Sequence, residues 1–257
     1  MGLAVAATIA TLSAAAFAIG SGGGLDPHFG HSVRGETLKA QRLGERDAAR
    51  KALVVGSIHG DETAGHRVIE ALQRRSGRVE AVDLWTVRTV NPDGAAAQTR
   101  RNARGVDLNR NFPYRWRGGV PPSSGYYPGP HALSEPESRA VVDLIERLRP
   151  TVTIWYHQPW GAVLLPCRGE AGIERRYARI ARFPTDRCRG AHLPGTATSW
   201  QERRVGDEAF VVELPGGGVS RAQARRHARA AAAVAMEGAR GPRLAVHGTG
   251  AVRASRR

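Results

Sequence analysis

Four side chains suited to metal or acid–base chemistry directly follow apolar runs of the sequence. The run "VVGSIHGDETAG" carries His59 and Glu62, "TVTIWYHQ" carries His157, and "EAFVVELP" carries Glu213. Two histidines and one glutamate make a mixed ligand set of the kind found in catalytic zinc sites, where water takes the fourth position. Zinc lowers the pKa of that water to about 7, and a carboxylate that is not a ligand then takes its proton. Glu213, on an otherwise apolar run, suits that second role.

Each of these residues also has an ordinary structural interpretation. A lone histidine such as His157 is usually a hydrogen-bonded structural residue. A glutamate at a helix start, like Glu62, often only complements the helix dipole, and Glu213 can emerge into solvent. The His-x-x-Glu spacing alone is a weak pattern. The joint placement of these residues after apolar runs favours a shared site.

A polar stretch, "NPDGAAAQTRRNARGVDLNRNFP", adds further candidates. Asn109 and Arg110 stand side by side and can form a fork that grips a carboxylate. Arg100 or Arg101 could polarise a carbonyl or stabilise an oxyanion, and Asp107 could orient a ligand histidine. The alternative is an arginine-rich solvated loop, which the composition also accommodates.

The motifs "HGDE", "NPDG", "GVDLNRNFP", "WYHQ" and "VVELP", in this order, resemble those of the M14 zinc carboxypeptidases. Within that family the sequence is most similar to the murein peptide amidase A branch, whose members carry a similar "TR-x-NA-x-GVDLNR" run. The segment "YYPGPHALSEPES" is also similar to that branch. The resemblance covers residues 31–237, and the ordered set is more specific than any single motif.

The resemblance implies a catalytic centre built on one zinc ion. His59, Glu62 and His157 are implied to bind it. Glu213 is implied to act first as the general base and later as the acid that protonates the leaving amine.

The resemblance also implies how a peptide is held. Asn109 and Arg110 would hold the free carboxylate of the released residue, and Asp107 would orient the first zinc histidine. Arg100 matches the arginine that polarises the scissile carbonyl, although the neighbouring Arg101 leaves this match open by one residue.

One departure from the family concerns a tyrosine that many members carry in a mobile loop before the last core strand. The corresponding loop here, residues 189–208, contains no tyrosine. The chain is also shorter than the digestive-type members. This departure bears on the choice of substrate more than on the chemistry.

Strands and helices that alternate along the chain must position these residues. Apolar runs predict strands, and helical spacing predicts helices. The expected strands are 36–41, 51–57, 81–90, 151–156, 162–166 and 208–215, and the expected helices are 62–76, 134–149, 170–182 and 220–238. Ser134 and Glu137 predict a capping box at one helix start, and "NPDG" predicts a turn.

This alternation predicts an α/β fold in a single domain, with a mixed, mostly parallel twisted sheet and helices on both faces. In such sheets, sites form at the carboxyl ends of the strands. His59, His157 and Glu213 all fall at predicted strand ends, so the fold explains why an apolar run delivers polar side chains into one cleft.

The N-terminus is apolar and uncharged from Gly2 to Gly24, and Ala16-Phe17-Ala18 forms a small-x-small triplet. This pattern is typical of a secretory signal peptide, although its first residues lack Lys and Arg. The alternative is a retained anchor, because the stretch only just reaches the about 18–20 apolar residues of a membrane span. Either interpretation predicts a secreted or otherwise extracytoplasmic protein.

These boundaries divide the chain into successive parts. We expect a signal peptide at 1–18, a flexible segment at 19–30, a catalytic domain at 31–238 and a basic disordered tail at 239–257.

Two cysteines, Cys167 and Cys188, are present. In an exported protein an isolated pair usually forms one disulfide, and the alternative is two unpaired thiols. Neither cysteine has a CxxC partner, so no zinc motif uses them.

The net charge is +15, and almost all of the basic residues are arginine. Such a surface favours polyanions such as nucleic acid, acidic lipid or acidic wall polymers, but a bias of the whole sequence towards alanine and arginine explains the charge equally well. No compact basic block alternates with aromatic residues, and no finger or RNA-binding motif is present. We therefore expect neither a nucleic-acid partner nor a stable membrane partner beyond the N-terminal segment.

The functional hypothesis is an exported, zinc-dependent hydrolase acting on a peptide with a free C-terminal carboxylate. By resemblance, the bond cleaved is the γ-D-glutamyl–diaminopimelate bond of cell-wall peptides. The alternatives are a general carboxypeptidase for L-peptides, a deacylase similar to aspartoacylase or succinylglutamate desuccinylase, and a non-catalytic wall-binding module. Glu213 argues against the last, since a binding module needs no buried general base.

Overall fold

The structure is a computed structural model that describes residues 25–75, 79–167, 170–187, 193–204 and 208–237. The predicted signal peptide and the predicted basic tail lie outside these ranges. Within them, no helix combines the length and apolar character needed to cross a membrane.

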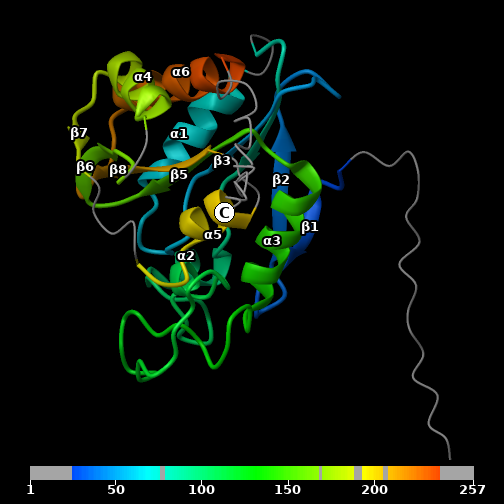
Figure 1. Ribbon diagram of the computed structural model, residues 1–257, viewed down its shortest axis with the longest axis vertical. Helices are drawn as coiled ribbons and strands as arrows, with labels where there is room; N and C mark the ends of the chain where they lie inside the picture. Colours follow the sequence, from blue (N-terminus) through cyan, green and yellow to red (C-terminus); the bar gives the residue numbers. More distant parts are fainter. Residues whose placement is uncertain (1–24, 76–78, 168–169, 188–192, 205–207, 238–257) are drawn as a thin grey trace, which may run out of the picture.

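The described residues form one mixed sheet of eight strands in the order β1-β2-β4-β3-β5-β8-β6-β7 (Figure 1). Strands β4, β3, β5 and β8 at its centre run parallel, whereas β2 and β6 are antiparallel to the central strands that they flank. The strands are β1 (His28–His31), β2 (Thr37–Arg42), β3 (Lys51–Val55), β4 (Asp83–Val87), β5 (Val152–His157), β6 (Trp160–Leu164), β7 (Thr185–Asp186) and β8 (Glu208–Pro215).

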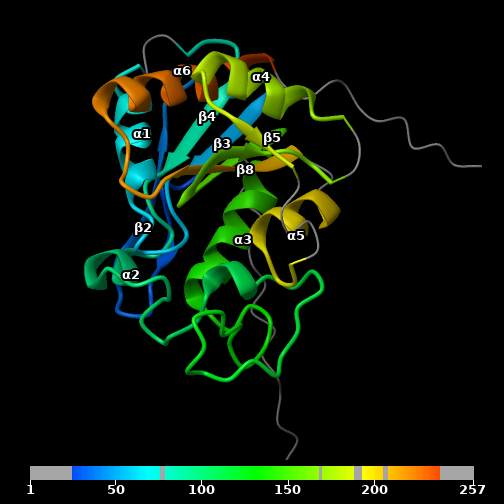
Figure 2. The same ribbon diagram turned by 90° about the vertical axis from the view of Figure 1, so that its left-hand side faces the viewer.

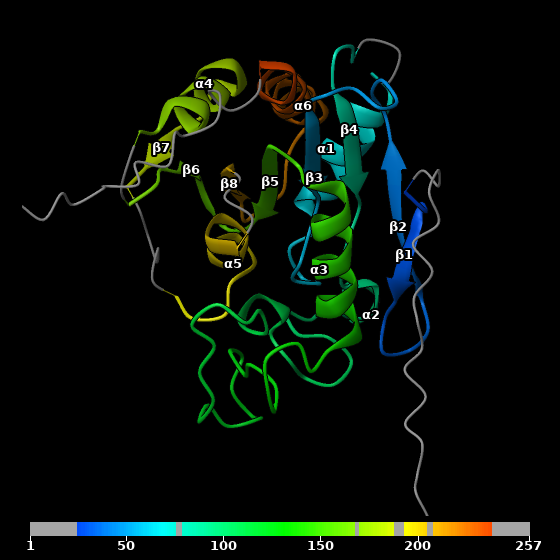
Figure 3. The same ribbon diagram turned by 45° about the vertical axis from the view of Figure 1, so that its right-hand side comes forward.

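Helices cover both faces of the sheet, and a separate apolar core lies between the sheet and the helices on each face. Helices α1, α4 and α6 share one core, and α3 and α5 share the other (Figure 2). Figure 3 shows α5 beside β8, with which it is in contact. The helices are α1 (Ala64–Gln73), α2 (Pro92–Ala97), α3 (Pro136–Leu148), α4 (Gly172–Ala181), α5 (Ala197–Arg204) and α6 (Arg221–Glu237). The predicted α/β fold is confirmed.

The central strands are buried on both faces, which explains why their sequences are continuous apolar runs rather than alternating ones. Every residue of β4 and β5 is buried. Parallel pairing aligns Val55 with Trp155 and, further along, His157 with Glu213. The carboxyl ends of β3, β5 and β8 therefore meet at one edge of the sheet.

Two glycines, one in the loop after β3 and one in α1, allow close backbone packing around this loop. A Cβ on Gly60 would lie 2.0 Å from the carbonyl carbon of Gly94, in α2. A Cβ on Gly65 would lie 2.0 Å from the carbonyl oxygen of Gly56. Only glycine permits these approaches, so the "HGDE" segment and α2 are packed backbone to backbone.

Two local predictions were wrong. The "NPDG" segment begins α2 rather than a turn: Asn91 caps the helix by accepting from the N–H of Gly94 at 2.9 Å, and Pro92 occupies the first helical position. Asn, Pro and Gly favour helix starts as well as turns, which explains the error.

The predicted capping box at α3 is also absent. Glu135, not Ser134, is the N-cap, and it makes no side-chain capping bond. The Ser134 hydroxyl instead accepts from Asn111 Nδ2 at 2.9 Å and donates to Glu135 at 2.7 Å. A tertiary contact with the preceding loop has taken the place of the local cap.

Besides α2 and a 3₁₀ turn at Leu108–Arg110, two strands and one helix were not predicted. Strand β1 begins at His28, inside the segment expected to be flexible, and pairs with β2. Strand β7 has two residues and α5 carries little apolar periodicity in "ATSWQERR". Short or weakly patterned segments like these owe their structure to tertiary contacts rather than to local sequence.

Glu174, in the first turn of α4, gives a prediction about stability. The side chain is 7% exposed, and its Oε2 has no hydrogen-bond partner among the described residues. Burial, together with Glu208 and Glu202, raises the pKa of this carboxyl from 4.5 to about 7. The folded state thus binds the proton more tightly than the unfolded state. The free energy of unfolding therefore falls as pH rises through this interval.

We expect Glu174→Gln to stabilise the protein by about 1–3 kcal/mol at pH 8, because the variant never buries a charge at this position. At pH 4 the two proteins should unfold with nearly equal free energies. Denaturant titrations at both pH values measure the difference. Glu80→Gln, at an exposed position, is the control; equal stabilisation by both variants would contradict this account of Glu174.

Candidate active site

His59, Glu62 and His157 bring their ligand atoms together at the edge where β3 and β5 end. His59 Nδ1 lies 2.8 Å from Glu62 Oε1, and His157 Nδ1 lies 2.8 Å from Glu62 Oε2. The two Nδ1 atoms are 3.2 Å apart. All three side chains are buried, and together they form a group able to hold a metal ion.

The donor set fits zinc. Two ligands that are each about 2.0–2.1 Å from a tetrahedral ion lie roughly 3.3 Å from one another, close to the 3.2 Å between the two Nδ1 atoms. Two imidazole nitrogens and one carboxylate are also the donors that borderline-soft zinc accepts. The buried residues that sequence reasoning singled out as ligands are therefore the ones the fold assembles.

Asp107 fixes the orientation of the first histidine. Its Oδ1 accepts from His59 Nε2–H at 3.1 Å and from the backbone N–H of Asn109 at 2.9 Å. Its Oδ2 accepts from both Nε and Nη2 of Arg100 at 3.0 Å. When Nδ1 loses its proton, as a metal ligand must, donation from Nε2 leaves the lone pair of His59 on Nδ1, where it faces Glu62 and His157.

The charges in this cluster support one another. Burial alone would raise the pKa of Asp107, but its bond with His59 and the positive charge of Arg100 lower it to about 2. Burial alone would likewise raise the pKa of Glu62, yet His157 and His59 hold it well below the usual range. For His59, burial lowers the pKa, but the bonds with Asp107 and Glu62 outweigh burial and raise it. Both carboxylates are thus ionised at neutral pH.

Arg100 and Arg101 point to different places. Arg100 Nη1 donates to Glu62 Oε1 at 3.2 Å and lies 3.3 Å from His59 Nδ1. Arg101 Nη1 instead donates to the backbone carbonyls of Pro122 and Ser124. Of the two arginines, Arg100 is the one beside the candidate ligands. Arg101 instead bonds to the backbone of the long loop between α2 and α3.

Glu213 lies next to the cluster through strand pairing, because it is the partner of His157 between β8 and β5. Its side chain is 7% exposed, and its Oε2 has no hydrogen-bond partner among the residues described. Burial and the neighbouring Glu62 raise the pKa of this carboxyl, and His157 offsets part of the rise. A buried carboxylate with a free acceptor and a raised pKa has the properties of a general base.

Asn109 and Arg110 follow Asp107 in a short 3₁₀ turn. Asn109 Oδ1 accepts from the backbone N–H of Ala197 at 2.9 Å, where α5 begins. This bond leaves the Nδ2 group as a donor. The Arg110 guanidinium lies 5.5 Å from the centre of the Tyr126 ring, and that of Arg100 lies 5.1 Å from the same ring. Two arginines and an amide donor therefore share one region.

Sequence reasoning missed two residues of this region. Gln158, which follows His157, donates its backbone N–H to Glu62 Oε2 at 3.2 Å, and its side chain joins Ala64 N to the Pro215 carbonyl. The "WYHQ" motif already contained it. Tyr126 opens the segment "YYPGPHALSEPES", which was noted only for its similarity to the murein peptide amidase A branch and was given no role at the site.

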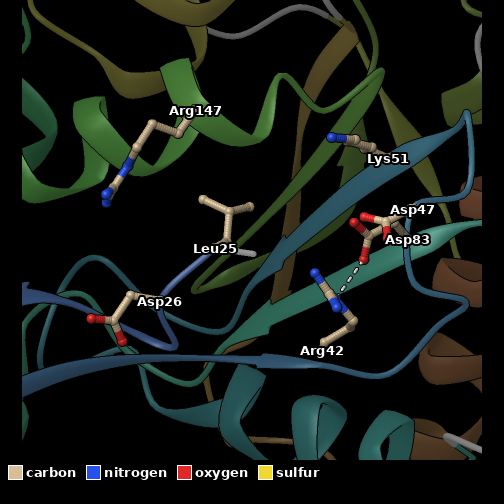
Figure 4. Close-up of a pocket in the computed structure, with 7 residues that line it drawn as sticks. All are labelled: Leu25, Asp26, Arg42, Asp47, Lys51, Asp83 and Arg147. Carbon is tan, nitrogen blue, oxygen red and sulfur yellow. Dashed lines mark ion pairs between the residues drawn. The ribbon is translucent and has the colours of Figure 1, made fainter. Parts of the chain in front are cut away.

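A separate pocket lies away from the cluster. A pocket of about 410 Å³ includes Lys51 and Asp83, at the amino ends of β3 and β4, and is thus at the opposite edge of the sheet. Figure 4 shows Arg42 facing Asp83 there, in an ion pair of 3.0 Å.

Cys167 is disulfide-bonded, and Cys188, the other half of the predicted pair, lies outside the described residues.

Comparison with known proteins places this site in a family. The sequence profile of the zinc carboxypeptidases, the M14 peptidases, matches residues 27–168. The chain belongs to the zinc carboxypeptidase family. It is therefore an enzyme of the peptidase and amidase class.

Two relatives show a branch of the family to which this chain is similar. Murein peptide amidase A of Escherichia coli (strain K12) is 31% identical over 191 residues, which cover 67% of this chain and 74% of that protein. The enzyme of the same name from Vibrio campbellii is 29% identical over 199 residues, covering 73% of this chain and 78% of the relative.

Solved structures agree with the fold. The crystal structure of murein-tripeptide amidase MpaA from Escherichia coli O157 superposes with a TM-score of 0.65 at 27% identity, over 81% of this chain and 90% of that one. Carboxypeptidase A from Helicoverpa armigera gives a TM-score of 0.68 at 21% identity, over 80% of this chain and 68% of that one. At that lower identity, the second comparison supports the fold alone.

Asp107 gives a testable prediction about the metal site. We expect Asp107→Asn to weaken zinc binding about 10- to 100-fold, because the amide no longer holds His59 with a charged acceptor. Zinc titration against a competing chelator measures the change. Asp143→Asn, on the exposed face of α3, is the control. Unchanged affinity in folded Asp107→Asn would contradict the orienting role.

Proposed function

We propose that this enzyme is an exported, zinc-dependent amidase that hydrolyses the γ-D-glutamyl–diaminopimelate bond of murein peptides. The observation that carries the proposal is the convergence of His59, Glu62 and His157 beside Glu213 and Arg110. Similarity to murein peptide amidase A over most of its length supports the substrate class. The apolar, uncharged N-terminus supports export.

Zinc held by His59, Glu62 and His157 would supply a water of lowered pKa and a Lewis acid for the scissile carbonyl. The protein supplies the remaining parts. Asp107 fixes the tautomer and orientation of His59, and Gln158 fixes Glu62 through its backbone N–H. Both contacts hold ligand atoms in place before a metal ion arrives, which limits the reorganisation needed on binding.

The C-terminal end of the peptide is held by Arg110 and Asn109. The guanidinium can donate two parallel bonds to a carboxylate, and Asn109 Nδ2 is free to donate because its Oδ1 is engaged by Ala197. Arg100 contacts Glu62 and lies over the same Tyr126 ring as Arg110, so it can donate to the carbonyl oxygen as negative charge develops there.

Glu213 transfers a proton from the attacking water to the leaving amine. Its Oε2 accepts a proton from the attacking water as the new C–O bond forms. The same carboxyl then gives that proton to the amine nitrogen as the C–N bond breaks. One proton is taken and one is returned, so Glu213 ends each cycle ionised. Its raised pKa suits both steps.

The proton-transfer role predicts the effect of Glu213→Gln. We expect turnover to fall by about 10²- to 10⁴-fold, since an amide cannot accept the proton. Zinc content, measured by atomic absorption after dialysis, should match that of the wild type. Glu36→Gln, an exposed position, is the control. Wild-type turnover in the Glu213 variant would exclude this role.

The substrate and metal are tested together. We expect the protein without residues 1–18 to release diaminopimelate from L-Ala-γ-D-Glu-meso-diaminopimelate, and a zinc chelator to abolish release until zinc is restored. Ordinary C-terminal L-peptides are assayed in parallel.

The remaining outcomes separate the alternatives. Efficient release of ordinary L-residues would instead indicate a general carboxypeptidase. Zinc binding without hydrolysis of either substrate would exclude the amidase proposal and leave a deacylase or a wall-binding module.

A further inference from the structure

A second, smaller pocket lies directly beside the site proposed for the peptide carboxylate. Its volume is about 220 Å³. The residues that line it include Arg110, Arg117, Val120, Tyr126, Pro128 and Pro194. Most of them belong to residues 117–128 of the long loop between α2 and α3, and the proposed mechanism gives this part of the loop no role.

The pocket begins where the carboxylate site ends. Arg110 belongs to both, and the Tyr126 ring lies 5.5 Å from the Arg110 guanidinium and 5.1 Å from that of Arg100. A residue whose α-carboxylate is held by Arg110 therefore has its α-carbon at the mouth of this pocket. The side chain on that carbon is the group that can fill it.

The size of the pocket suits one side chain. At about 30 Å³ per water molecule, its volume holds roughly seven water-sized groups. That is below the about 300 Å³ typical of pockets for whole small ligands. A long, unbranched side chain fits this space.

The chemistry of the lining is that of an apolar channel with a positive end. Val120, Pro128 and Pro194 offer contacts to a hydrocarbon stem. Arg117 is exposed, and no hydrogen bond or ion pair joins it to another described residue. No acidic side chain is among the lining residues. The pocket thus attracts a terminal carboxylate and repels a side chain that carries only an amine.

We propose that this pocket receives the side chain of the released residue, and that Arg117 selects a side chain ending in a carboxylate. The inference rests on the proposed function, and it names the residue that reads the distal end of diaminopimelate. Diaminopimelate is lysine with an added carboxylate on its terminal carbon, so Arg117 distinguishes two otherwise identical residues. The planar guanidinium can bind that carboxylate through two parallel hydrogen bonds.

The test compares two peptides that differ only in this carboxylate, L-Ala-γ-D-Glu-meso-diaminopimelate and L-Ala-γ-D-Glu-L-Lys. The measured quantity is the ratio of their kcat/KM values. We expect the wild type to prefer diaminopimelate and Arg117→Gln to reduce the ratio about 10- to 100-fold, as loss of a charge-assisted hydrogen bond predicts. Arg117→Lys should retain part of the preference. A general loss of folding or of zinc would lower both values without changing their ratio.

Arg46→Gln is the matched control, because Arg46 is exposed in the turn before β3 and so lies at the opposite edge of the sheet. It removes the same charge and should leave the ratio unchanged. Calorimetric binding of free meso-diaminopimelate and L-lysine to Glu213→Gln, with and without Arg117→Gln, gives a readout independent of turnover. The affinity ratio should fall with the Arg117 substitution.

The outcomes separate this inference from the proposed function. A wild type that releases diaminopimelate but keeps its preference in Arg117→Gln would overturn the role of Arg117 and leave the amidase intact. A wild type without preference between the two peptides would also overturn it. A wild type that cleaves neither peptide would overturn the proposed function itself.

Discussion

The buried carboxylate of Asp107 is the contact on which the rest of the site depends. It holds His59 through one oxygen and Arg100 through the other, and it also caps the 3₁₀ turn Leu108–Arg110 by accepting from the backbone N–H of Asn109. A fully buried anion is costly unless it is paired and hydrogen-bonded. Here the pairing is complete, so the charge that had to be neutralised also sets the positions of a metal-ligand candidate and of the residues proposed to stabilise the oxyanion and to hold the peptide carboxylate.

The sequence predicted the parts of the site that follow buried strands. A continuous apolar run fixes where a central strand ends, and parallel pairing then brings such ends together. His157 and Glu213 are paired in this way, and His59 follows the end of β3. Arg100 and Asp107 lie in a loop, where their residue types suggested candidate roles but no strand pattern predicted their positions, and the family resemblance matched them to those roles.

Other features depend on contacts between distant segments, which no local pattern records. Tyr126 lies over two arginines because the loop after α2 folds back across them. Ser134 leaves its expected capping role because Asn111 offers a tertiary partner. The "NPDG" segment is ambiguous locally, since its residues favour both turns and helix starts. In the structure this segment starts helix α2, and the backbone of Gly94 in that helix packs closely against Gly60.

His59 and His157 are 98 residues apart in sequence, yet their ring nitrogens meet. An ion bound by both histidines would link two stretches of chain that are distant in sequence. The unfolded chain cannot offer both nitrogens in this arrangement, so binding would favour the folded state by mass action. The melting temperature of the enzyme would then rise and fall with the free zinc around it. Its lifetime in the folded state would then depend on the metal supply of its surroundings.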